Sequence, residues 1–227
     1  MSLKRNIPNF ISILNLVVGF IALWLVAQQA FLEAFYLLCT CLILDFFDGF
    51  FARLLNAKSD FGAQFDSFAD LVSFGVLPGF YVLTYLQALN APVILLVLSA
   101  IYPATAAIRL VRFNLDDSAS SDYFTGMPTP ISALLLMSLI HLDLKTLIDN
   151  PELHRTVIAV FVVLVSLMMI SKLKILSLKF QGFEWGTNKW RYVLIVMGAI
   201  TLIFAPSFAV VLIYIELLIL SLLSFKI

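Results

Sequence analysis

Residues 45–70 read DFFDGFFARLLNAKSDFGAQFDSFAD, and they place four aspartates within sequence that is otherwise apolar enough to cross a bilayer. At about 100° per residue, Asp45 and Asp48 share one face of a helix. By the same spacing, Asp66 and Asp70 share one face of the next helix. A short turn between the two helices would make them antiparallel and set the two pairs level with each other. The sequence therefore predicts that four carboxylates from two helices converge on one small volume.

A cluster of this kind needs compensating charge at membrane depth. A carboxylate there costs about 2.5–3.5 kcal/mol on insertion scales, and neighbouring like charges repel each other. Divalent cations offset both costs, and ligands that are all oxygen favour a hard ion, Mg²⁺ or Mn²⁺. The alternative is a set of ion pairs that only holds helices together, but Arg53 is the only base beside the acids in the sequence.

Small residues accompany the aspartates on the same helical faces. Gly49, Ala52 and Gly62 leave room for a bulky group to reach a bound metal. Arg53 can neutralise phosphate. Acids, space and a cation together indicate phosphoryl transfer with metal assistance.

The composition of the whole chain is that of a membrane protein. Its 227 residues are 62% hydrophobic and 12% charged, and their mean hydropathy is +1.05. The zero net charge argues against nucleic acid as a partner. We expect an all-α, polytopic helical bundle that forms a single membrane domain over residues 1–227, with an N-terminal interfacial segment at 2–9. About eight transmembrane helices are predicted, at 11–28, 31–54, 61–87, 91–113, 128–148, 152–172, 190–205 and 207–224.

Basic residues predict the orientation in the membrane, because Lys and Arg are enriched on the cytoplasmic side. With the N-terminus inside, all but two of the 14 basic residues face the cytoplasm. The exceptions are Lys145 and Arg155. This orientation puts the acidic cluster near the cytoplasmic face of the inner membrane, and His141 and His154 on the far side as surface residues.

The first apolar segment begins with polar residues that have two possible roles. Asn9, Ser12 and Asn15 can bond a nucleotide or phosphate, or Asn9 or Ser12 can cap the helix.

Further polar residues follow the cluster. Ser73 falls close to the face of Asp66 and Asp70, where it can also serve only for packing. Arg109 and Arg112 lie on one helical face and can together hold an anion, or extend to lipid headgroups. The loop at Gly126 is rich in proline and is expected to be rigid.

The pattern D-x2-D-G-x2-A-R-x8-G-x3-D-x3-D resembles the signature of the CDP-alcohol phosphotransferases, with every signature position filled. These integral membrane enzymes join a CDP-activated alcohol to an acceptor hydroxyl and release CMP. The resemblance covers about residues 5–172 and leaves 173–227 as a helical extension. The phrases S-F-G-V-x-P from Ser73, R-x-x-R-F-N from Arg109 and F-x-G-x-P-x-P from Phe124 resemble the phosphatidylserine synthase branch.

The resemblance implies a donor, CDP-diacylglycerol, an acceptor, L-serine, and a role for each candidate residue. Two ions of Mg²⁺ or Mn²⁺ would be held by Asp45, Asp48 and Asp66, with Asp70 also contacting one. Asp70 would be the general base on the acceptor hydroxyl. CDP and its diphosphate would contact Gly49, Ala52, Arg53, Gly62, Asn9, Ser12 and Asn15. Arg112 would be the main contact for serine, and the other contacts would be Arg109, Ser73 and Gly126. The family also suggests a homodimer surrounded by membrane lipids.

Other functions stay open on the sequence alone. Within the family, the acceptor could be glycerol 3-phosphate or inositol phosphate, or the donor an archaeal-type lipid. In a different class, a cation transporter could use the acids as its ion site, although transporters of that kind are often built from inverted repeats and this chain has none.

Overall fold

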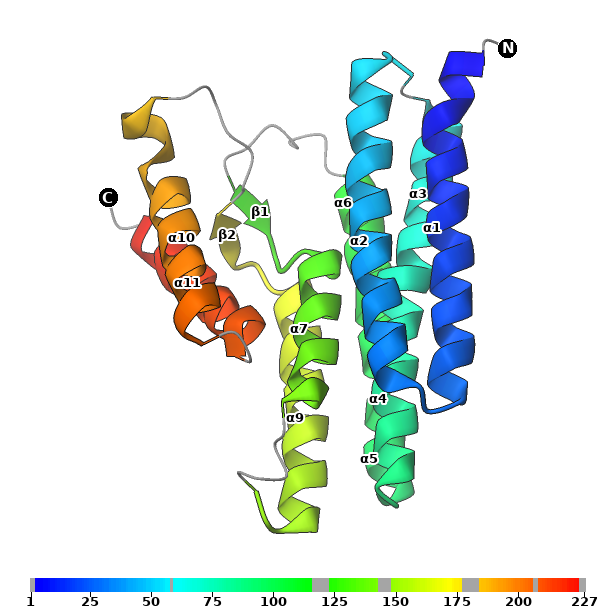
Figure 1. The fold of residues 1–227 in the computed structure, drawn as a ribbon, viewed down its shortest axis with the longest axis vertical. Helices are drawn as coiled ribbons and strands as arrows, with labels where there is room; N and C mark the ends of the chain where they lie inside the picture. The colour runs from blue at the N-terminus through cyan, green and yellow to red at the C-terminus, as the bar shows by residue number, and fades with distance from the viewer. Residues whose placement is uncertain are drawn as a thin grey trace.

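The computed structural model describes residues 3–57, 59–115, 123–142, 148–176, 184–205 and 208–224, and it is a bundle of helices with one small pair of strands (Figure 1). Among these residues, five helical segments are long and apolar enough to cross a membrane. They are Asn6–Ala27, Phe31–Leu54, Asp60–Ala88, Val93–Leu115 and Pro151–Ile170. Two more apolar helices are shorter. The all-α membrane fold is therefore confirmed, whereas the number of eight spans is not.

The first two helices form an antiparallel hairpin. Helix α1 (Leu3–Ala27) turns into α2 (Phe31–Leu54) through Gln29, whose φ of 60° reverses the chain. The described part of the segment expected at the interface is continuous with the first span, because α1 is helical from Leu3 and contains Pro8. Pro8 lies in the second turn of α1, where it removes the backbone hydrogen bond to the carbonyl four residues earlier, yet the helix continues through it.

The third span is one continuous rod with a change of helix type. Helix α3 (Asp60–Asp70) begins where the Ser59 side chain accepts a hydrogen bond from the backbone N–H of Gly62, at 3.1 Å. A π-helical segment, η1 (Leu71–Val76), and helix α4 (Leu77–Ala88) follow without a break. The π-helical turn therefore begins directly after the last aspartate of the cluster, a position typical of functional sites.

Two helices make up the fourth span because a proline interrupts the backbone hydrogen bonds of the helix. Helix α5 (Val93–Leu98) ends before α6 (Ile101–Leu115). Pro103 cannot donate to the carbonyl of Ser99, and the N–H of Tyr102 donates to it at 3.2 Å instead. The bundle is completed by α7 (Thr129–His141) and α9 (Pro151–Ile170).

The prediction that His154 lies on the surface is wrong. His154 is only 4% exposed, and its ring packs edge-on against Tyr85, with 6.3 Å between ring centroids. His154 is in the first turns of α9, which pack against α5 and bury this end of the helix.

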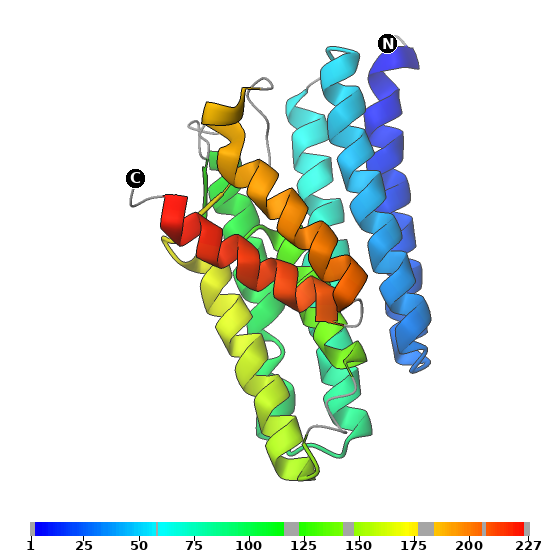
Figure 2. The same ribbon diagram turned by 60° about the vertical axis from the view of Figure 1, so that its left-hand side comes forward.

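Two short strands and a helical hairpin lie beyond the core spans. Strand β1 (Tyr123–Thr125) pairs antiparallel with β2 (Lys174–Leu176), and no strand was expected from the sequence. Helices α10 (Trp185–Phe204) and α11 (Ala209–Ser224) pack together and cross the bundle obliquely (Figure 2).

Hydrogen bonds give the hairpin a definite attachment. The Thr201 hydroxyl donates to Glu216 Oε1 at 2.5 Å, and so joins α10 to α11. The Ser221 hydroxyl accepts from the backbone N–H of Leu176 at 3.0 Å. Glu216 thus pairs within the hairpin, and Ser221 binds the hairpin to β2.

Candidate active site

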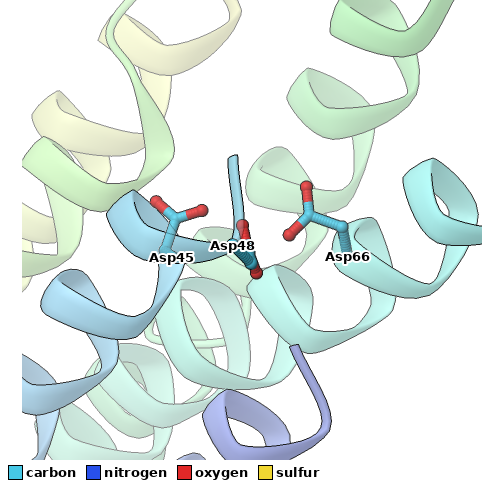
Figure 3. Close-up of side chains that lie close together, drawn as sticks. All are labelled: Asp45, Asp48 and Asp66. Atoms are coloured by element: carbon cyan, nitrogen blue, oxygen red, sulfur yellow. The ribbon is translucent and has the colours of Figure 1, made fainter. Parts of the chain in front are cut away.

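Three of the four predicted carboxylates meet in one place. Asp45 and Asp48 on α2 and Asp66 on α3 each offer one oxygen, and these three oxygens lie within 4.8 Å of one another. Figure 3 shows the three side chains directed toward the space between the two helices. Ligand oxygens on opposite sides of an octahedral Mg²⁺ ion are about 4.2 Å apart. The spacing therefore fits a divalent ion after only a small rotation of the side chains.

Helix α1 supplies a hydrogen bond to this cluster. The hydroxyl of Ser12 donates to Asp48 Oδ2 at 2.8 Å, and Asp48 is only 5% exposed. This bond satisfies one oxygen of one aspartate. In contrast, Asp66 Oδ1 and Asp70 Oδ1 are buried and have no hydrogen-bond partner among the described residues. Buried polar atoms are nearly always paired in folded proteins, so these oxygens fit a site that receives a cation or a substrate hydroxyl.

Asp70 lies one turn beyond the three-carboxylate group, at the end of α3. It interacts electrostatically with Asp45, Asp66 and Asp48, and with the guanidinium of Arg109 from α6. Arg109 is 7% exposed. The fourth aspartate therefore interacts with both the acidic group and a buried cation.

A cavity of about 520 Å³ opens beside Asp48 and Asp66. Its lining includes nearly all of the residues predicted to bind the donor, namely Asn9, Ser12, Gly49, Ala52, Arg53 and Gly62. A methyl group added at Gly49 would meet only the Arg53 side chain, at 3.6 Å, so Gly49 leaves open space as expected. A methyl group at Gly62 would lie 2.9 Å from Asn9 Oδ1. Gly62 therefore allows α1 and α3 to approach closely, in addition to making room.

Two predicted residues lie away from this cavity and contact each other. Asn15 is fully buried, and its Oδ1 accepts a hydrogen bond from the Ser73 hydroxyl at 2.9 Å. Asn15 Nδ2 has no partner among the described residues. A methyl group at Gly19 would collide with Ser73 Oγ. Asn15 and Ser73 therefore form a polar contact in the tightly packed junction between α1 and η1.

The two arginines of α6 have different surroundings. Arg109 Nε donates to the carbonyl of Met127 at 3.0 Å, and its Nη atoms make no hydrogen bond to the described residues. Arg112 is exposed, and its Nη1 donates to the carbonyl of Ile170, the last residue of α9, at 2.9 Å. Arg109 thus has buried Nη donors that no described residue uses, whereas Arg112 donates to a helix end.

Gly126 has a structural reason to be glycine. Its φ of +73° favours glycine, and a Cβ there would collide with the carbonyl oxygen of Met169. Its N–H donates to the carbonyl of Leu173 at 2.7 Å. Gly126 therefore allows the loop that carries Met127, the partner of Arg109, to press against the end of α9.

Sequence reasoning missed several residues that line the cavity. Ala57, Ser59, Asp60 and Ala63 surround the turn between α2 and α3, and Pro8 precedes Asn9 on α1. Their closeness in sequence to the motif could have indicated them. Phe113 belongs to the R-x-x-R-F-N phrase on α6, but it is far from the aspartates in sequence, and only the folded structure brings it to this site.

Comparisons with known proteins show the family of this chain. The CDP-alcohol phosphatidyltransferase family model matches residues 5–170. The chain is 31% identical over 194 residues to the CDP-diacylglycerol–serine O-phosphatidyltransferase of Helicobacter pylori (strain ATCC 700392 / 26695), covering 85% of this chain and 80% of that protein. The enzyme of the same name from Bacillus subtilis (strain 168) is 36% identical over 179 residues, covering 78% and 94%. That of Methanocaldococcus jannaschii is 31% identical over 169 residues, covering 74% and 73%.

The family match spans the acidic cluster and the helices that hold it, and it sets aside the cation transporter. The chain belongs to the CDP-alcohol phosphatidyltransferase family.

Proposed function

We propose that this protein makes phosphatidylserine by transferring the phosphatidyl group of CDP-diacylglycerol to L-serine, with release of CMP. The observation that carries the proposal is the meeting of Asp45, Asp48 and Asp66 beside a cavity lined by the signature residues. The names of the related enzymes support the choice of serine as the acceptor. We further propose one membrane domain, with its catalytic core at about 5–172 and a helical extension at 173–227.

The donor binds in the cavity with its diphosphate near the cluster. Asp45, Asp48 and Asp66 would hold Mg²⁺ or Mn²⁺, and two such ions would neutralise the diphosphate and stabilise charge on the departing CMP. Arg53 lines the same cavity and adds a positive charge toward phosphate. Gly49 and Ala52 keep the α2 wall free of bulky side chains.

Asp70 acts as general base. Its buried Oδ1 has no partner among the described residues, so it is free to accept a proton. It takes this proton from the serine hydroxyl as the hydroxyl oxygen attacks the lipid-linked phosphorus. The bond between that phosphorus and the CMP oxygen breaks, and CMP leaves with the electron pair.

Arg109 holds the serine carboxylate. It is buried, it interacts with Asp70 electrostatically, and its Nη donors are not used by the described residues. A guanidinium can bind a carboxylate through two parallel hydrogen bonds. The sequence ranked Arg112 first for this role, but its bond to the end of α9 favours a structural one. Ser73 and Gly126 then support the site without direct contact with serine.

The protein lies in the cytoplasmic membrane with its N-terminus inside. The start of α1 and the end of α2 lie at one end of the bundle, and the start of α9 at the other (Figure 1). Arg53, Arg109 and Arg112 are toward the first end, while Arg155 is near the start of α9. Four other basic residues of the orientation argument lie outside the described residues, namely Lys58, Lys145, Lys179 and Lys226. A homodimer remains a proposal from the family resemblance.

The acceptor is tested with purified protein, CDP-diacylglycerol and Mg²⁺ or Mn²⁺. Serine, glycerol 3-phosphate and inositol phosphate are offered separately, and lipid product and CMP are measured. We expect phosphatidylserine and an equal amount of CMP with serine alone. A lipid product from a phosphorylated acceptor, with none from serine, would overturn the headgroup and leave the reaction class intact.

Variants of the aspartates separate metal binding from proton transfer. Asp48→Ala and Asp66→Ala should each weaken Mn²⁺ binding by at least about tenfold, because each removes a direct ligand. Asp60→Ala is the matched control, since Asp60 lines the cavity outside the cluster. Unchanged Mn²⁺ affinity in Asp48→Ala and Asp66→Ala, measured by electron paramagnetic resonance, would remove these residues as ligands.

The general base is tested separately. Asp70→Asn should lower turnover by about 10²–10⁴-fold while CDP-diacylglycerol still binds.

Lysine substitutions distinguish the two arginines. Arg109→Lys should raise the KM for serine by roughly tenfold or more, because an ammonium group cannot reproduce the paired hydrogen bonds. The KM for CDP-diacylglycerol should change little. Arg112→Lys serves as the control and should affect serine less. A larger rise in the serine KM for Arg112→Lys than for Arg109→Lys would restore the original ranking.

Thiol labelling tests the orientation. Asn56 follows α2 and Gln28 follows α1, and both are exposed turn residues at opposite ends of the bundle. In a background with Cys39 and Cys41 replaced by serine, an impermeant reagent added outside intact cells should label Gln28→Cys and not Asn56→Cys. The reverse labelling pattern would show that the N-terminus faces outward.

A further inference from the structure

One wall of the donor cavity comes from a helix that is remote in sequence from the other lining residues. Among the described lining residues, all but one lie between Pro8 and Asp66, on α1, α2, α3 and the turn before α3. The exception is Phe113 on α6, which is also the aromatic residue of this set. The cavity therefore has acidic, basic and small residues on most sides and a benzene ring on another.

We propose that Phe113 is the stacking platform for the cytosine ring of the nucleotide. This inference rests on the proposed function, because it takes a CDP-linked lipid as the donor. A diphosphate near Asp48, Asp66 and Arg53 leaves the base as the part of the nucleotide that needs a flat, apolar partner. Phe113 is the described lining residue that offers one.

Neighbouring residues hold Phe113 in position. Immediately before it, Arg112 donates to the carbonyl of Ile170 on α9 at 2.9 Å. Immediately after it, Asn114 Nδ2 donates to the Ser67 hydroxyl on α3 at 2.8 Å. The end of α6 is thus attached to two helices on either side of Phe113. A ring held in place before the ligand arrives loses little conformational freedom when a base stacks on it.

The charge next to the ring is consistent with this role. The Cζ atom of Arg109, one turn earlier on α6, lies 5.3 Å from the centroid of the Phe113 ring. The guanidinium covers one face, which leaves the other face for a base. Phe113 is 44% exposed, so ligand can reach it. Stacking of a base on an aromatic side chain typically changes affinity by about 5- to 150-fold.

The test compares ligands with and without a base. Binding of CMP, UMP and inorganic pyrophosphate is measured directly, with Mg²⁺, on wild type and on Phe113→Leu. We expect CMP to bind about tenfold or more weakly to the variant, and pyrophosphate to bind as it does to wild type. UMP should weaken in parallel with CMP, because stacking uses the face of the ring and not its hydrogen-bonding edge.

Further variants control for folding and for shape. Phe113→Trp keeps an aromatic face and should bind CMP within a few-fold of wild type, whereas Phe113→Met, without a ring, should resemble Phe113→Leu. Phe61→Leu alters an exposed phenylalanine of α3 outside the lining and should change nothing. Wild-type CMP affinity in Phe113→Leu and Phe113→Met, or an equal loss for pyrophosphate, would overturn the role. Because these are binding measurements, they stand apart from the choice of acceptor, which the product assay decides.

Discussion

Carboxylates gathered at membrane depth form the constraint on which the rest of this structure depends. Removing each from water costs free energy, and like charges so close repel one another. The hydrogen bond from Ser12 satisfies one oxygen of Asp48, but Asp66 Oδ1 and Asp70 Oδ1 find no partner among the described residues. A divalent cation, as proposed for this site, would offset both costs. Small and polar residues of three helices line the cavity beside these carboxylates.

Helix α6 links this cluster to the remainder of the bundle. Polar side chains near its end contact three different elements, because Arg109 holds the loop before α7, Arg112 holds the end of α9 and Asn114 holds α3. The residues of the R-x-x-R-F-N phrase thus combine positioning with direct access to the site. A shift of α6 would therefore move the Arg109 guanidinium, which interacts with Asp70, together with Phe113 in the cavity wall.

The long hydrophobic runs and the acidic cluster could be predicted because both follow from local periodicity. Five predicted spans correspond to helical segments long enough to cross a membrane, and α10 and α11 form near their predicted positions as a hairpin. The strands β1 and β2 could not be predicted, since each is three residues long and is stabilised by a partner strand whose residues lie 49 to 53 positions away along the chain. The burial of His154 could not be predicted either, because it depends on contacts with α5 and Tyr85, and the periodicity of α9 gives no information about those contacts.

The sequence by itself determined the chemistry of the site: which residues are acids, at what spacing on two adjacent helices, and with which small residues beside them. Helical geometry converts that spacing into a shared face without further information. Only the tertiary structure decided which of the remaining candidate residues line the cavity and which lie elsewhere. It places Asn9 and Ser12 at the cavity, pairs Asn15 with Ser73 behind it, buries Arg109 and brings Phe113 to the wall. Those outcomes depend on which helices pack together, and packing is a property of the whole chain, not of local sequence.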